Sequence, residues 1–132
     1  MITDYLELIR QVKQSLELII EKIDSLDFCP ITWDDSYLLL NELEAAVAEI
    51  DKLSEQLYPI FSDDSFCNDT QNKDLVKNIK EADNCFNAFS THFSKIYSVL
   101  EEEGPRECYD QDYNYLSAQL KKAKQHLNQI LI

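Results

Sequence analysis

The 132-residue sequence contains one glycine, three prolines and only 12 basic side chains. Phosphate-cradling loops, dinucleotide-binding turns and tight hairpin turns need backbone conformations that glycine adopts most cheaply, so one glycine argues against all three. No run approaches the roughly 18 consecutive apolar residues of a membrane span, and the N-terminal residues lack the basic start and apolar run of a signal peptide. We therefore expect a cytoplasmic, helical protein that does not bind membranes.

The few basic residues face 25 acidic ones, which gives a formal net charge of -13. A chain with this charge repels phosphate, so direct binding of nucleic acid is not expected. The acidic excess is concentrated on residues 31–61 and at the ends of the segment 70–103. The charge therefore favours a basic protein as the partner.

Four cysteines are present, Cys29, Cys67, Cys85 and Cys108, with no C-x-x-C pair and no histidine at ligand spacing. This pattern argues against a zinc site or a thioredoxin-type motif. In a reducing compartment we expect all four to be free thiols. Cys29 and Cys108 fall in two connections that an up-down topology brings to the same end, so a redox pair is the alternative there.

Apolar residues recur at alternating steps of three and four, which predicts amphipathic helices over residues 2–26, 32–57, 70–103 and 110–131. The four apolar stripes run from Ile2 to Leu26, from Leu39 to Leu57, from Leu75 to Leu100 and from Tyr113 to Ile130. The chain length fits one domain spanning residues 1–132. We expect an all-α, antiparallel, up-down-up-down four-helix bundle.

Local signals mark the ends of these helices. Thr32 and Asp35 have the spacing of a partial capping box, and Asp110 is expected to cap the last helix. Pro59 is expected to end the second helix, and Gly104 to end the third. The connection over residues 60–70 is polar and rich in residues that form turns.

The third predicted helix is longer than the others by about two turns, so part of it should project or bend. If it runs antiparallel to the last helix around residues 104–109, His92 lies level with Lys121 and away from His126. Neither histidine has the Glu-x-x-His spacing of a di-iron bundle, and no nucleophile lies near a base. We therefore expect no metal, no cofactor, no catalytic residue and no enzymatic activity.

Acidic and tyrosine side chains are the candidates for binding a partner. Glu42 and Glu49 lie seven residues apart on one outer strip, and the three consecutive glutamates before Gly104 oppose the dipole of their helix. Tyrosine among acids contributes apolar contact area at small entropic cost. The candidate partner-binding residues are Glu42, Glu49, Glu101, Glu102, Glu103, Tyr109, Asp110, Asp112 and Tyr115.

Together these features suggest a non-enzymatic binding protein that neutralises a basic partner. The most concrete form is an immunity or inhibitor protein that covers the cleft of a nuclease-type toxin, since such a cleft must be basic to hold phosphate. One alternative is a nucleic-acid mimic that inhibits a DNA- or RNA-binding protein. Another is a helical adaptor or a homodimer formed through the first helix, whose Leu6, Leu8, Leu18 and Ile20 lie off the main stripe.

Overall fold

The computed structural model describes residues 2–105 and 108–131, with side chains from residue 4 onward. This part of the chain contains helices and no strand, so the all-α prediction is confirmed. The elements are α1 (Ile2–Ser25), α2 (Trp33–Phe61), α3 (Asp64–Asn68), the short 3-10 helix η1 (Thr70–Asn72), α4 (Lys73–Glu103) and α5 (Asp110–Ile130). Among the described residues, none of the helices combines the length and apolarity needed to cross a membrane.

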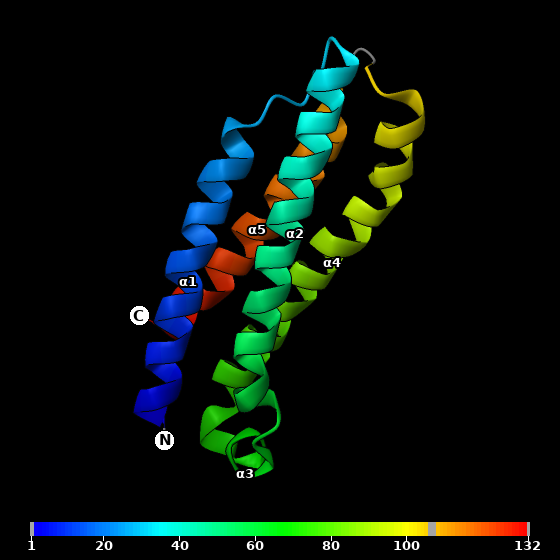
Figure 1. Ribbon diagram of the computed structural model, residues 1–132. Helices are drawn as coiled ribbons and strands as arrows, with labels where there is room; N and C mark the ends of the chain where they lie inside the picture. The colour runs from blue at the N-terminus through cyan, green and yellow to red at the C-terminus, as the bar shows by residue number, and fades with distance from the viewer. Residues whose placement is uncertain (1, 106–107, 132) are drawn as a thin grey trace.

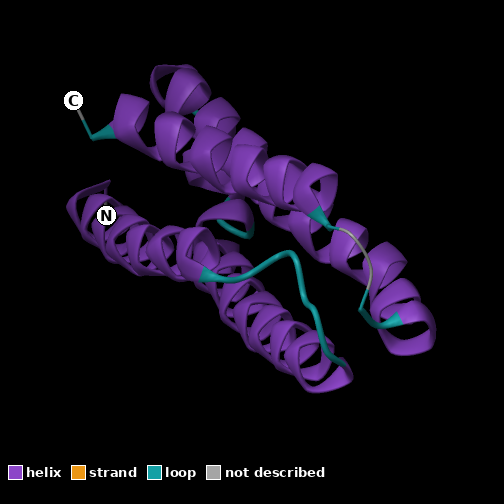
Figure 2. Ribbon diagram, turned by 90° about the horizontal axis from the view of Figure 1, so that it is seen from above, coloured by secondary structure: helices purple, strands orange, loops and turns teal. Residues whose placement is uncertain are grey.

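The four long helices lie beside one another. In Figure 1, α1 rises from the N-terminus, α2 returns to the end that holds α3, α4 rises again and α5 descends. α1 packs along α2 and α5, and α4 packs along the same two helices. Seen from above, α1 and α2 form one layer and α4 and α5 form the other (Figure 2). The apolar face of each helix is therefore enclosed by two neighbours.

The predicted stripes supply the core. Their central members are buried in one contiguous apolar cluster, whereas the terminal members Tyr5, Leu26, Leu75, Tyr113 and Ile130 are only partly buried. The side chain of Ile2 lies outside the described residues. Because burial of apolar surface is the main favourable contribution to folding, the 3-4 periodicity both forms the helices and fixes the face that each turns inward.

The predicted start of α2 is confirmed and its predicted end is wrong. The hydroxyl of Thr32 accepts a hydrogen bond from the Asp35 amide at 3.1 Å, and the Asp35 carboxylate accepts one from the Thr32 amide at 3.4 Å. α2 continues through Pro59 to Phe61. Proline costs this last turn only one amide donor, and the turn buries Ile60.

The polar connection after α2 is more ordered than the sequence indicates. It contains α3, whose cap residue Asp63 accepts hydrogen bonds from the Phe66 amide at 3.1 Å and from the Tyr5 hydroxyl at 2.6 Å. The rings of Tyr5 and Phe66 also meet edge to face, with centroids 4.9 Å apart. α4 then begins at Lys73 rather than at residue 70, because residues 70–72 form η1.

The register between α4 and α5 differs from the predicted one. His92 Nε2 lies 2.9 Å from Asp112 Oδ1 instead of beside Lys121, a displacement of nine residues along α5. His126 is displaced in the same sense, with Nδ1 3.0 Å from the side-chain oxygen of Asn78. The prediction assumed that the chain reverses directly at residues 104–109, whereas α5 begins well below the end of α4.

As a result, two helix ends extend beyond their neighbours (Figure 2). The last nine or so residues of α4 extend past the start of α5, by about 13 Å at 1.5 Å per residue. On the other layer, Lys22 near the end of α1 pairs with Glu42 at 3.3 Å, so the first turns of α2 also extend past α1. We call residues 31–38 together with residues 97–104 the projecting end.

Gly104 holds the two parts of the projecting end together. Its backbone has φ +58° and ψ -126°, a conformation that side chains with a Cβ rarely adopt. The indole of Trp33 lies directly over it, and a Cβ added to Gly104 would fall 2.3 Å from Trp33 Cζ3. Glycine is therefore required both by the backbone and by the aromatic ring that covers it.

We expect Gly104→Ala to lower the free energy of unfolding by at least about 2 kcal/mol, since strain at positive φ adds to overpacking against Trp33. In a Trp33→Ala background the same substitution should cost about 1 kcal/mol less, because the overlap is gone. Urea unfolding followed by circular dichroism measures all four proteins of this cycle. Equal costs in the two backgrounds would contradict the direct contact.

The hydrogen bond from Tyr5 to Asp63 also has a consequence for pH dependence. It holds the pKa of Asp63 below its usual range, with a further contribution from the Phe66 amide, and it raises the pKa of Tyr5. Because the folded-state pKa of Asp63 is depressed, the interaction stabilises the fold above the unfolded-state pKa. That stabilisation is lost as the pH falls through the folded-state pKa.

In a Tyr5→Phe variant we expect the pKa of Asp63 to rise toward its usual range, although the Phe66 amide keeps part of the shift. The variant should also lose less stability than the wild type between neutral pH and about pH 3, below the ordinary range for aspartate. Carboxyl NMR titration measures the first effect and urea unfolding at the two pH values the second. Tyr37→Phe is the control and should leave Asp63 unchanged, since Tyr37 lies on α2 at the projecting end.

Candidate functional site

The predicted acidic residues at the end of α4 lie on the projecting end. Glu101, Glu102 and Glu103 are exposed, as are Asp34 and Asp35 at the start of α2. Trp33 precedes the two aspartates in the sequence, Gly104 follows the three glutamates, and Trp33 contacts Gly104. The two acidic groups therefore lie on either side of one contact between helices. The Tyr97 hydroxyl is hydrogen-bonded to Glu101, which raises the pKa of Tyr97. The structure therefore gathers acids from α2 and α4 on one surface.

Glu42 and Glu49 do not belong to this surface. The Glu42 carboxylate is half-buried and pairs with Lys22 of α1 at 3.3 Å. Glu49 is exposed beside a depression between α1 and α2 that Leu18 and Lys52 also line. The two residues of the predicted strip on α2 therefore have different roles: Glu42 pairs with α1, and Glu49 lies on a separate surface farther from the projecting end.

Tyr109 was predicted to bind the partner, but the structure shows that it is buried, with only 1% of its surface exposed. Its hydroxyl donates a hydrogen bond to the Gly104 carbonyl at 2.8 Å. Its amide donates to the Phe28 carbonyl at 2.7 Å. Because both ends of the residue are used inside the molecule, Tyr109 is a structural residue that joins two connections and the end of α4.

The remaining predicted residues lie at the start of α5 and are partly occupied. Asp110 is exposed but is the first helical residue of α5 rather than its cap, and no side-chain bond caps this helix. Asp112 is engaged by His92 at 2.9 Å. Tyr115 is partly exposed and stacks on His92, with ring centroids 4.4 Å apart. These residues adjoin the projecting end from below.

Cys29 and Cys108 form a disulfide, with Cα atoms 4.2 Å apart. The expectation that all four cysteines are free is therefore wrong for this pair, and Cys67 and Cys85 are the free ones. The up-down topology predicted that the two connections lie at the same end of the molecule. The hydrogen bond from the Tyr109 amide to the Phe28 carbonyl brings their backbones together. Burial raises the pKa of the Cys85 thiol, which disfavours its reactive thiolate form.

A group of three potential metal ligands occurs at one place among the described side chains. Cys29, Cys108 and Asp110 offer ligand atoms within 4.8 Å of one another. Both sulfurs are used by the disulfide, so neither is a thiolate ligand in this state. Asp110 Oδ1 lies 3.6 Å from Cys29 Sγ, at the edge of this group.

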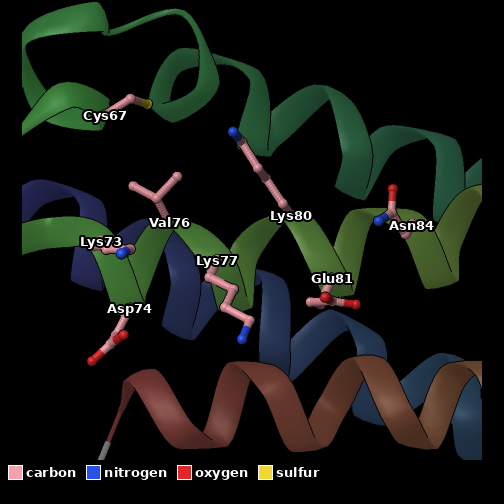
Figure 3. A pocket seen from close by; sticks show the side chains of 8 residues that line it. All are labelled: Cys67, Lys73, Asp74, Val76, Lys77, Lys80, Glu81 and Asn84. Carbon is pink, nitrogen blue, oxygen red and sulfur yellow. The ribbon is translucent and has the colours of Figure 1, made fainter.

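A hollow of roughly 690 Å³ lies beside the start of α4. Figure 3 shows that its charged side chains diverge: Lys80 points toward α2, whereas Asp74 and Lys77 point toward α5. Cys67 borders the hollow, and its thiol donates to the Ile60 carbonyl at 3.1 Å. Because these groups do not converge on a common point, the hollow does not present a catalytic arrangement.

The sequence interpretation missed four exposed apolar residues at the start of α2, namely Ile31, Trp33, Tyr37 and Leu38. A signal for them exists in the sequence. Trp33 and Tyr37 are four residues apart, and neither belongs to the stripe that begins at Leu39. Large apolar residues on the polar side of an amphipathic helix indicate a surface with an unusual role.

No family model, curated protein or solved structure matches this chain. The function must therefore be inferred from the geometry and chemistry of its own residues.

The disulfide gives a test of how strongly the two connections are joined. The residues it links are 79 apart, and closing a loop of that length in the unfolded chain is worth about 4 kcal/mol. We expect a Cys29→Ser, Cys108→Ser double variant to lose about that much free energy of unfolding, as should the reduced wild type.

Urea unfolding with and without a reducing agent measures this effect. Cys67→Ser is a matched control because a serine hydroxyl can also donate to the Ile60 carbonyl, and it should retain the response to reduction. If reduction destabilises the double variant as much as the wild type, the loss does not come from this disulfide.

Proposed function

We propose that this chain is an antiparallel four-helix bundle that binds and neutralises a basic protein without acting as an enzyme. The most concrete form of the proposal is an immunity or inhibitor protein that covers the cleft of a nuclease-type toxin. The observation that carries it is the net charge of -13, displayed on a helical surface with exposed acids gathered at the projecting end. Such a surface attracts a basic cleft and competes with phosphate for it.

The proposed site consists of Glu101, Glu102 and Glu103, together with Asp34 and Asp35 across the Trp33 contact. Tyr115 and Asp110 extend this surface onto α5. Three acids at the C-terminal end of α4 oppose the helix dipole, which is an unfavourable placement for negative charge. Binding of a basic partner would offset that cost.

A cytoplasmic location is the proposed setting, and a cognate toxin would be neutralised before it reaches its substrate. The Cys29 to Cys108 disulfide counts against this setting, because cytosolic thiol systems keep such pairs reduced. Alkylation of thiols under denaturing conditions in freshly lysed cells, followed by mass measurement, distinguishes the two compartments. Two alkylated cysteines indicate an oxidising compartment and four indicate the cytoplasm.

Charge reversal tests the proposed function directly. Affinity capture from cells that express the chain should retain a basic protein, and addition of the chain should inhibit that protein's nuclease activity. We expect the Glu101→Lys, Glu102→Lys, Glu103→Lys variant to bind at least about tenfold more weakly and with a smaller salt dependence, because rim charges set the encounter rate.

The matched control reverses Glu21, Glu55 and Glu81, three exposed acids on three helices away from the projecting end, and changes the net charge equally. It should bind almost as well as the wild type. Retention of no basic protein would falsify the proposal. Competition by duplex DNA, together with binding to many basic proteins, would instead support a nucleic-acid mimic. A dimer mass in light scattering would support self-association, for which Leu18 is the exposed large apolar residue among the described side chains of α1.

A further inference from the structure

The projecting end carries an apolar patch as well as acids. Seven large apolar side chains are exposed among the described residues, and four of them fall within residues 31–38. The exposed fractions are 83% for Ile31, 60% for Leu38, 47% for Tyr37 and 46% for Trp33. Single exposed apolar side chains are ordinary, but a group of this kind marks a surface for interaction. We call these four residues the apolar patch.

Local structure does not account for the exposure of the apolar patch. Ile31 precedes the cap residue Thr32, where an apolar residue commonly packs against the fourth helical position. That position is Ser36, which is buried and donates its hydroxyl to the Thr32 carbonyl, so Ile31 has no apolar partner there. Leu38 adjoins the core stripe in sequence but faces away from it.

The two aromatic side chains of the apolar patch are held in one geometry. The rings of Trp33 and Tyr37 lie one helical turn apart with centroids 6.0 Å from each other. Trp33 is also seated on Gly104, and the capping box at Thr32 fixes the first turn that carries it. Fixed aromatic side chains are effective anchors because little conformational entropy is lost on binding.

The charge around the apolar patch determines what can cover it. Asp34 and Asp35 lie within it in sequence, and Glu101, Glu102 and Glu103 lie across the Trp33 contact. A second copy of the chain related by two-fold symmetry would bring these acids against their own equivalents. Like charges facing each other oppose that arrangement, and an anionic lipid surface is opposed for the same reason.

We propose that the projecting end is a docking surface for a segment of a basic protein in which apolar side chains are flanked by lysine or arginine. The apolar side chains of the segment cover Ile31, Trp33, Tyr37 and Leu38, and its basic side chains meet the surrounding acids. This rests on the proposed function, because it assumes a basic partner, and it deepens that function by naming the surface and the form of the partner. The surface has an apolar centre and a charged rim, the usual division in protein interfaces.

Trp33 is the only tryptophan in the chain, so its fluorescence reports on this surface alone. The probes are two synthetic peptides with equal numbers of lysines, one carrying leucine at helical spacing and the other serine at the same positions. We expect the leucine peptide to shift Trp33 emission to shorter wavelength and to bind at least about tenfold more tightly than the serine peptide, since each buried leucine adds to affinity.

An Ile31→Ser, Leu38→Ser variant tests the apolar patch without threatening the fold, since both side chains are mostly exposed. It should bind the leucine peptide about tenfold more weakly while its binding of the serine peptide stays unchanged. Leu18→Ser is the matched control, because Leu18 is 67% exposed on α1, away from the projecting end. Circular dichroism confirms that all three proteins have the same helical content.

Equal affinity for the two peptides, or equal loss in the Leu18 control, overturns the docking surface while leaving an acidic binding protein in place. A blue shift that grows with protein concentration in the absence of peptide also overturns it, because a second copy then covers the apolar patch. Absence of binding by both peptides, combined with failure to capture any basic protein, removes the proposed function and the docking surface together.

Discussion

The hydroxyl of Tyr109 accounts for much of the geometry described above. The hydrogen bond from this hydroxyl to the Gly104 carbonyl sets the distance between the end of α4 and the start of α5. The amide of Tyr109 is bonded to the Phe28 carbonyl in the other layer. A buried hydroxyl that lost its partner would leave a costly unsatisfied polar group, so this path is strongly favoured. Because α5 starts below the end of α4, the last turns of α4 can pack only against α2, and the projecting end follows.

The sequence predicted the helices well because core burial and helical periodicity are the same physical constraint. Every central position of the four stripes is buried, and the Thr32 cap and the Gly104 stop are where local chemistry places them. The errors occur where tertiary contacts determine the end of a helix or the register between two helices. Pro59 remains helical because Ile60 is buried behind it, and the displaced register of His92 depends on the path that Tyr109 imposes.

The candidate site was only partly predictable for a similar reason. Charge is visible in a sequence, so the three glutamates at the end of α4 were found. The burial of a residue in a connection cannot be predicted from helical periodicity. Tyr109 belongs to no stripe and was therefore taken for a surface residue, although it is buried. The apolar patch was missed because the sequence interpretation followed the stripe that begins at Leu39, and the exposed residues Trp33 and Tyr37 lie off that stripe.

Acids and apolar residues make different contributions to such a surface. Exposed acids speed the encounter with a basic protein and select its sign, but each contributes little once screened by salt. Desolvated aromatic and aliphatic side chains hold the complex together and set its lifetime. The acids and the apolar residues lie on the ends of two helices, where the projecting end has fewer packing neighbours than the rest of the molecule. The contact of Trp33 with Gly104 therefore holds these two helix ends together.

The disulfide between Cys29 and Cys108 also changes the covalent topology of the molecule. It closes α2, α3, η1 and α4 into a ring, and α1 and α5 extend from the closure as two open arms. A protease that cleaves once within the ring, for example in the connection after Phe61, yields two peptides that remain covalently joined. The two helices that form the projecting end are therefore tethered at its base by a bond that does not depend on their noncovalent packing.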